Sequence, residues 1–487
     1  MSTSMSETTA EALPPPGSVG QPDAHADGGF WASVGEALRG SHRDFTQGAV
    51  SRAILILAIP MVLEMVMESV FAVCDVFFVS KLGAGAVATV GLTESWLTLI
   101  YALAMGLAIG TSAMVARRTG ERDREGAARA AMQGIILGLG VALVVGVAGG
   151  LLAPRMLALM GASPDVIATG SRYARVMLGG NVTIVMLFLI NAIFRGAGDA
   201  AIAMRVLWLA NAINILLGPC LIFGLGPFPR LGVAGAAIAT NIGRGTGALF
   251  AFSRLLKPGS RIDIHARHLR LEPALIRRVV SIAWSACVQL LIGMGSWIAL
   301  VRILSTFGSN VLAGYTIGIR VILFALLPAA GLANAAATMV GQALGARKPE
   351  RAEAAVKIAG TYNMVVLSVV GALIAIFAPQ IARFFTSDQA IIPYASSVLR
   401  IVACGFPFYA WGMVISQSFN GAGDTKTPTL LNLLVFWCWE IPIGYVLGIK
   451  LGFGPLGVYT AMAIAFSTYA VAGAALFKRG RWKEKKV

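Results

Sequence analysis

The chain has 487 residues, of which 57% are hydrophobic and only 13% are charged. A soluble domain has about 25% charged residues, so this composition excludes a soluble globular protein, a disordered chain and a coiled coil. The net charge of +16 does not indicate a nucleic-acid partner, because the basic residues lie in short segments between apolar runs. The five cysteines lie inside apolar runs without metal-ligand spacing, so no disulfide or metal site is predicted. The fold class predicted is an all-α integral membrane protein.

The chain begins with a polar segment and continues as a series of apolar runs. Residues 1–45 are predicted to be a disordered cytoplasmic tail, because they are polar and lack the pattern of a secretion signal. Twelve apolar runs follow, each long enough to span a bilayer as a helix. Their cores are 53–80, 86–116, 130–152, 165–194, 206–224, 233–253, 279–305, 311–344, 358–378, 393–418, 429–449 and 457–477. A basic linker (254–278) and a basic tail (478–487) complete the chain.

The basic residues predict the orientation of the spans. The loops between spans are numbered here in chain order, so that loop 1 joins the first span to the second. Of the 39 lysines and arginines, 28 lie in the amino-terminal tail, the even-numbered loops and the carboxyl-terminal tail. Five lie in the odd-numbered loops. Cytoplasmic loops carry the excess of basic residues, so both termini are predicted to be cytoplasmic in a protein of the inner (plasma) membrane.

An internal repeat relates each position i to position i + 225 of the same chain. The segment FRGAGD at 194–199 recurs as FNGAGD at 419–424, and Leu231-Gly232-Val233 recurs as Leu456-Gly457-Val458. Each half holds six spans, so both halves insert in the same direction and form a parallel repeat around a central cavity. The predicted lobes are residues 46–253 and 279–477.

The duplicated turn resembles that of the multidrug and toxic compound extrusion (MATE) family, as do CDVFFVSKLG at 74–83 and MVGQALGA at 339–346. The resemblance covers about residues 50–478. It implies a monomeric transporter, not an enzyme, that uses no cofactor and exports organic cations or other amphiphiles in exchange for protons or sodium ions. A lipid-linked saccharide flippase of the same superfamily is the alternative.

Five acidic residues lie inside apolar spans, where a charge is costly and requires a reason. Glu64, Glu68 and Asp75 share one stripe of the first span at 100° per residue. Crowded carboxylates in a low-dielectric site can hold and release a proton near neutral pH. The alternative for Glu64 and Glu68 is that they hydrogen-bond neighbouring helices.

The family resemblance implies that Asp75 couples transport to the cation, together with Asn214 and Thr240. The family's second carboxylate is replaced by Gly218 in this sequence. Either Glu68 supplies the missing carboxylate or the protein uses protons alone. Because sodium prefers several charged and neutral oxygen ligands, the loss of one favours protons.

The remaining polar residues of the spans suggest a cavity and a structural pair. Glu94, Trp96, Met65 and Asn191 are predicted to line the substrate cavity, where Trp96 offers a cation–π face. A polar link between the first two spans is the alternative for Glu94. Further predictions are a neutralising Glu440–Arg320 pair and bending, or a fixed kink, at Pro60 and Pro328.

Overall fold

The computed structural model describes residues 30–41, 43–257 and 259–485, and over these residues it contains helices and no strands. The first half holds α1 (Phe30–Arg39), α2 (Val50–Ser80), α3 (Ala84–Gly120), α4 (Arg124–Leu159), α5 (Pro164–Gly179), α6 (Asn181–Ala197), α7 (Ala200–Phe223) and α8 (Val233–Leu255). The second half holds α9 (Pro273–Leu304), α10 (Ser309–Gly345), α11 (Pro349–Ile376), α12 (Ala378–Phe385), α13 (Ile392–Cys404), α14 (Phe406–Gly421), α15 (Lys426–Asn432), α16 (Ile441–Tyr445) and α17 (Pro455–Lys478). Short turns of helix, η1 to η5, lie at Ala266–Leu269, Ser305–Phe307, Leu433–Glu440, Val446–Lys450 and Arg481–Glu484.

The helices provide the spans that the apolar runs predict. Within the described residues, ten helices are long and apolar enough to cross a membrane, and the pair α13 and α14 forms an eleventh with a 57° bend. Helix α8 completes the set, although glycines, alanines and Arg244 lower its hydropathy. The protein is therefore an all-helical, multi-pass membrane protein, because helices satisfy their own backbone groups in lipid.

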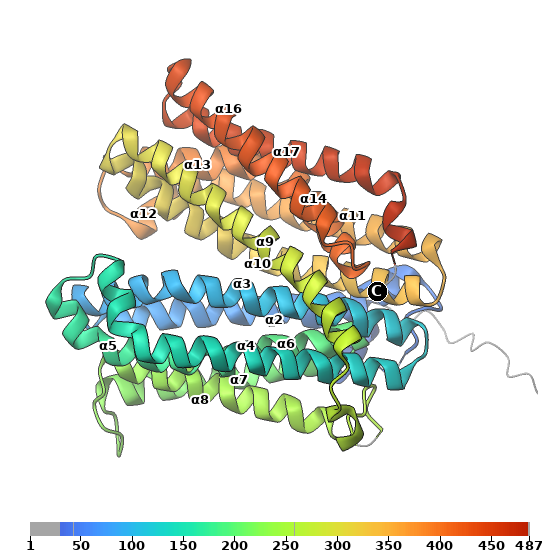
Figure 1. Cartoon of the computed structure of the whole chain (residues 1–487). Coiled ribbons are helices and arrows are strands. Elements are labelled where there is room, and N and C mark those ends of the chain that lie inside the picture. The colour runs from blue at the N-terminus through green and yellow to red at the C-terminus, as the bar shows by residue number, and fades with distance from the viewer. Residues whose placement is uncertain (1–29, 42, 258, 486–487) are drawn as a thin grey trace, which may run out of the picture.

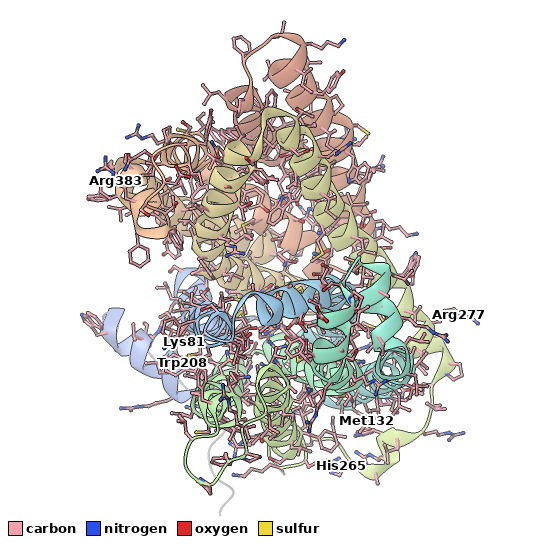
Figure 2. All side chains as sticks on the ribbon, turned by 90° about the vertical axis from the view of Figure 1, so that its left-hand side faces the viewer. Lys81, Met132, Trp208, His265, Arg277 and Arg383 are labelled. Atoms are coloured by element: carbon pink, nitrogen blue, oxygen red, sulfur yellow. The ribbon has the colours of Figure 1, made fainter. Side chains whose placement is uncertain are left out.

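The helices form two lobes, one above the other in Figure 1. Helices α2 to α8 form the first lobe, in which α5 and α6 make one span, Pro164–Ala197. Helices α9 to α17 form the second lobe, in which the segment from α15 to η4 makes one span, Lys426–Lys450. Helices α2 and α3 of the first lobe pack against α9 and α10 of the second lobe. Figure 2, which faces the left-hand end of Figure 1, shows one lobe above the other.

The repeat is visible in the backbone as well as in the sequence. Helix α3 (84 to 120) and helix α10 (309 to 345) begin and end at positions related as i to i + 225. Among the described residues, two non-glycine residues have positive φ, Arg122 at 60° and Arg347 at 57°, and they follow the same relation.

The relation changes before the last helix of each lobe. Helix α8 begins after Gly232 and α17 begins after Gly454, and these two caps have matching backbone angles. For the last helices, position i therefore matches position i + 222. The predicted equivalence of residues 231–233 with 456–458 is wrong, although the repeat itself is correct.

The lobes are closed against each other at one end of the molecule, which holds the described carboxyl terminus (Figure 1). Thr338 Oγ1 and Gln342 Nε2 of α10 donate to the carbonyls of Arg195 and Gly196, at 3.2 and 2.9 Å. A Cβ on Gly120 would lie 2.0 Å from the Gln342 carbonyl oxygen, so only glycine permits this approach of α3 to α10. We call this region the closed end.

The segment before α2 is ordered where the sequence predicts a disordered tail. Residues 1–29 of that tail lie outside the described residues. The later part forms α1 and a loop in which Phe45 is buried, and Arg351 of the second lobe donates to the Phe45 carbonyl at 2.8 Å. Asp44 in this loop pairs with Arg122 at 2.9 Å. Burial alone would raise the pKa of Asp44, but hydrogen bonds from Thr46 and Arg122 outweigh it and lower that pKa.

Candidate coupling and substrate site

Glu64 forms a buried ion pair within the first lobe. Its side chain is 2% exposed, and Oε1 accepts from Arg195 Nη1 at 2.6 Å and from Asn191 Nδ2 at 3.3 Å. Both partners come from α6, so the pair links α2 to α6. Arginine from the duplicated turn thus neutralises a carboxylate that lipid would not tolerate alone. This geometry favours the alternative in which Glu64 hydrogen-bonds a neighbouring helix.

Glu68 lies about one turn further along α2 and has its own arginine. Oε1 lies 3.3 Å from Arg244 Nη2 of α8, and Oε2 accepts from Asn211 Nδ2 of α7 at 3.1 Å. Arg244 is buried, donates to the Tyr101 hydroxyl at 2.7 Å and lies 5.4 Å from the centroid of the Phe71 ring. The Glu68 partner Asn211 precedes Gly218 by seven residues, about 10 Å along α7. Of the two alternatives for the missing carboxylate, this geometry argues against Glu68 and favours protons alone.

Asp75 differs from the other two acids of α2. It is partly exposed and accepts no hydrogen bond from any residue in the described part of the chain. Its electrostatic neighbours are Glu94 of α3 and Arg244, and it also acts on the buried Tyr173 of α5. Arg244 therefore lies within electrostatic reach of two carboxylates, Glu68 and Asp75, that stand about 10 Å apart along α2.

Asn214 and Thr240 meet inside the first lobe. Asn214 Nδ2 donates to Thr240 Oγ1 at 2.7 Å, and both side chains are buried between α7 and α8. A Cβ on Gly218 would lie 3.9 Å from Asn214 Oδ1, an ordinary van der Waals distance. The space at Gly218 could therefore hold a side chain, and the glycine leaves it without an oxygen ligand.

A central cavity of about 480 Å³ lies between the lobes. It contains the predicted residues Met65 and Asn191, together with Glu64, Glu68 and Arg195 of the first lobe. The second lobe adds apolar side chains and a row of amides and hydroxyls, which comprises Asn334, Thr338, Gln417 and Asn420. Most of the wall is apolar, and its two carboxylates are each paired with an arginine. Such a wall suits a molecule with a large apolar body and a few polar groups.

Two residues predicted for the cavity lie elsewhere. Trp96 packs into the core of the first lobe, where its Nε1 donates to the Met156 carbonyl of α4 at 3.2 Å, so it presents no free cation–π face. Glu94 is exposed and does not line the cavity. Its electrostatic neighbour is Arg320 of the second lobe, so it faces across the gap between the lobes.

The predicted Glu440–Arg320 pair is absent among the ion pairs of the described residues. Glu440 is buried inside the second lobe, and its Oε2 lacks a hydrogen-bond partner in the described part of the structure. Arg320 is exposed and acts on Glu94 instead. Equal depth in the membrane does not place two residues on facing sides of a lobe, and that is why the prediction failed.

The two prolines lie inside continuous helices. Pro60 is buried in α2, and Pro328 lies in α10. Both helices run without interruption through the proline, so bending at these positions stays a prediction.

Sequence reasoning missed the arginines that hold the site together. Arg195 lies at the start of the duplicated turn, and Arg244 is a lone basic residue in the apolar run 233–253, so neither pattern indicates a carboxylate partner. One signal was available for Arg195: the matching position of the second half is Asn420, so the charge is specific to one copy of the repeat. The Tyr101 and Asn211 contacts depend on how the helices pack and had no signal in the sequence.

Apolar spans arranged in two lobes around a cavity, with paired charges inside one lobe, define a multi-pass membrane transporter. The MatE family model matches residues 60–220 and 285–446, which is more than half of the chain. The chain therefore belongs to the MATE family of membrane transporters.

Individual relatives agree with this assignment. The chain is 25% identical over 423 residues to the probable multidrug resistance protein YoeA of Bacillus subtilis, covering 86% of this chain and 91% of that protein. It is 24% identical over 444 residues to the probable multidrug resistance protein NorM of Thermotoga maritima, covering 90% of this chain and 94% of that protein. A solved structure titled as the outward-facing conformation of a MATE family multidrug resistance transporter superposes with a TM-score of 0.84, at 30% identity, covering 90% of this chain and 97% of that chain.

Proposed function

We propose that the protein is a proton-coupled antiporter that exports amphiphilic compounds, organic cations among them, across the plasma membrane by alternating access. It acts as a monomer and needs no cofactor. The closed end faces the cytoplasm, because the loops and tails at this end carry most of the basic residues. The described conformation then has its cavity shut toward the cytoplasm, which corresponds to the outward-facing state. The names of the relatives support multidrug compounds as substrates.

The single observation that carries the coupling proposal is the position of Asp75. It is the one acid of α2 without a hydrogen-bond partner among the described residues, and it shares the electrostatic influence of Arg244 with Glu68. A charged Asp75 competes with Glu68 for Arg244, whereas a protonated Asp75 leaves Arg244 to Glu68. Protonation therefore changes the contacts that hold α2 against α8, and α2 also lines the cavity.

The oxygen ligands favour protons over sodium ions. A sodium site needs several oxygens, preferably with more than one charge. Asn214 and Thr240 already satisfy each other, and Gly218 contributes no oxygen. A proton needs a single carboxylate, and Asp75 provides it.

The cavity supports an amphiphilic substrate rather than a strictly cationic one. Arg195 and Arg244 neutralise the two carboxylates of the wall. Binding then depends on the apolar wall, its methionines and the amides of the second lobe. A saccharide flippase would require a more polar wall than this cavity has.

The test is export of a fluorescent organic cation from proteoliposomes under separately imposed proton and sodium gradients. We expect transport with the proton gradient alone and none with the sodium gradient alone. Asp75→Asn should reduce proton-driven export to the rate of empty liposomes, because the neutral amide mimics a permanently protonated carboxyl. Equal export by Asp75→Asn and the unaltered protein would remove Asp75 from the coupling, and sodium-driven export would overturn the choice of ion.

A further inference from the structure

A second pocket, of about 220 Å³, lies near the closed end and apart from the central cavity. It forms where the end of α1, the start of α7, the end of α8 and the linker meet. Its wall carries five basic side chains and one acidic side chain, Asp199. The basic residues are Arg39, Arg205, Arg254, Lys257 and Arg261.

Two of the arginines are held in place by backbone carbonyls. Arg205 Nη2 donates to the carbonyls of Leu38 and Arg39, at 2.7 and 2.9 Å. Arg261 donates to three carbonyls, those of Ala197, Ser41 and Arg43, at 2.6 to 2.9 Å. Asp199 interacts electrostatically with Arg261, so the acid of the pocket is already engaged. The fixed guanidinium groups make this wall a preformed surface.

Four of the five cations of the pocket have no partner of opposite charge within the described residues. The side chains of Arg39, Arg254 and Lys257 form no ion pair or hydrogen bond there, and Arg205 bonds only to neutral carbonyls. Four like charges around one small cavity repel each other, and an anion among them would remove that repulsion. A phosphate group has several acceptor oxygens and matches the forked donors of arginine.

Exposed apolar side chains lie near the pocket residues Arg254 and Lys257 in the sequence. They are Leu249 and Phe250 of the last turns of α8 and Leu256 directly after this helix. Basic residues at the boundary of a lipid-facing surface are placed to contact phosphate headgroups.

We propose that this pocket binds the phosphate group of an anionic ligand, either the headgroup of an anionic phospholipid or a soluble phosphate compound. Occupancy would connect the linker between the lobes to α1, α7 and α8. The site is separate from the coupling carboxylates and from the substrate cavity, so it stands or falls independently of the proposed function.

The experiment measures lipid binding to the purified, full-length protein by native mass spectrometry and by thermal unfolding. The probes are phosphatidylglycerol, phosphatidylcholine and inorganic phosphate. The test variant is Arg254→Gln/Lys257→Gln, since neither side chain forms an ion pair or hydrogen bond with a described residue. The matched control is Arg277→Gln, an exposed arginine at the start of α9 that lies on the opposite flank from α1 (Figure 2).

We expect the unaltered protein and Arg277→Gln to bind phosphatidylglycerol more tightly than phosphatidylcholine. The double variant should bind phosphatidylglycerol on the order of 30-fold more weakly, because each basic residue near an anionic surface contributes roughly a factor of five. Displacement of phosphatidylglycerol by inorganic phosphate would identify a soluble phosphate as a competent ligand, and no displacement would assign the site to lipid.

Two results would overturn the proposal. One is equal binding of the two lipids by the unaltered protein, with no effect of inorganic phosphate. The other is a double variant that keeps the affinity of the unaltered protein for phosphatidylglycerol. The comparison of probes on the unaltered protein needs no variant, so the proposal stays testable if the double variant folds poorly.

Discussion

The two lobes are copies of one six-helix unit, yet they differ in their buried charges. Glu64 of the first lobe corresponds to Gln289 of the second, and its partner Asn191 corresponds to Ser416. The hydrogen bond survives the exchange: Asn191 donates to Glu64, and Gln289 Nε2 donates to Ser416 Oγ at 3.2 Å. The scaffold therefore holds this contact between helices with or without charge.

The two arginines and Asp75 show the same asymmetry. In the relation of i to i + 225, Arg195 corresponds to Asn420 and Asp75 corresponds to Leu300. In the relation that applies to the last helices, i to i + 222, Arg244 corresponds to Phe466. The first lobe thus carries two ion pairs and a carboxylate without a hydrogen-bond partner among the described residues. The second lobe has neutral side chains at the positions that match Glu64, Asp75, Arg195 and Arg244. We infer that one copy has specialised in cation coupling.

Removal of one partner of a buried ion pair gives the largest expected effect. Arg195→Asn alone leaves Glu64 buried without its cation, and loss of one partner of a buried pair costs about 3–5 kcal/mol. Addition of Glu64→Gln recreates the neutral arrangement of Gln289 and Asn420. The double variant should recover to within about 1 kcal/mol of the unaltered protein.

Thermal unfolding in detergent measures the stability of the unaltered protein, Arg195→Asn, Glu64→Gln and the double variant, which together form a double-mutant cycle. A double variant that is as unstable as Arg195→Asn would show that the lobes are not interchangeable at this pair.

A carboxylate at Gly218 would increase the asymmetry. Gly218→Asp adds a charged oxygen beside Asn214, in a space that already accommodates a Cβ. We expect sodium to stimulate export by this variant and its apparent affinity for sodium to rise about tenfold, since sodium gains a charged ligand. Export measured at several sodium concentrations tests the effect, and Gly218→Ala controls for the added volume. Equal responses of the two variants would show that this position does not contribute to a sodium site.

Glu440, the acidic residue inside a span of the second lobe, should have the smallest effect. Glu440 is buried and makes no ion pair with a described residue, so Glu440→Gln removes no charge partner. We expect a change in stability of about 1 kcal/mol or less and proton-driven export at the rate of the unaltered protein. A loss of proton-driven export in Glu440→Gln would place coupling in both lobes.

The sequence predicts the spans and the repeat because the length of an apolar run and a constant offset between matching segments are both read directly from the order of the residues. It also predicts that Asn214 and Thr240 share one region and that Met65 and Asn191 face the cavity. It does not predict that Arg244 of α8 reaches Glu68 of α2, because such contacts depend on the rotation of packed helices about their axes.

The same limitation explains Trp96, which lies in the core of the first lobe, and Glu440, which does not meet Arg320. The change of offset before α17 comes from a shorter loop, which covers residues 451–454 in the second half and residues 224–232 in the first. The apolar pattern from which the spans are predicted does not show where such a loop loses residues.

The most direct test of the central claim is the release of protons when substrate binds to purified protein. A pH-sensitive dye in weakly buffered detergent solution reports the release from the unaltered protein, Asp75→Asn and Glu440→Gln. We expect release by the unaltered protein and by Glu440→Gln, and none by Asp75→Asn, although substrate binds to all three. Release by Asp75→Asn equal to that of the unaltered protein would contradict the assignment of coupling to the first lobe.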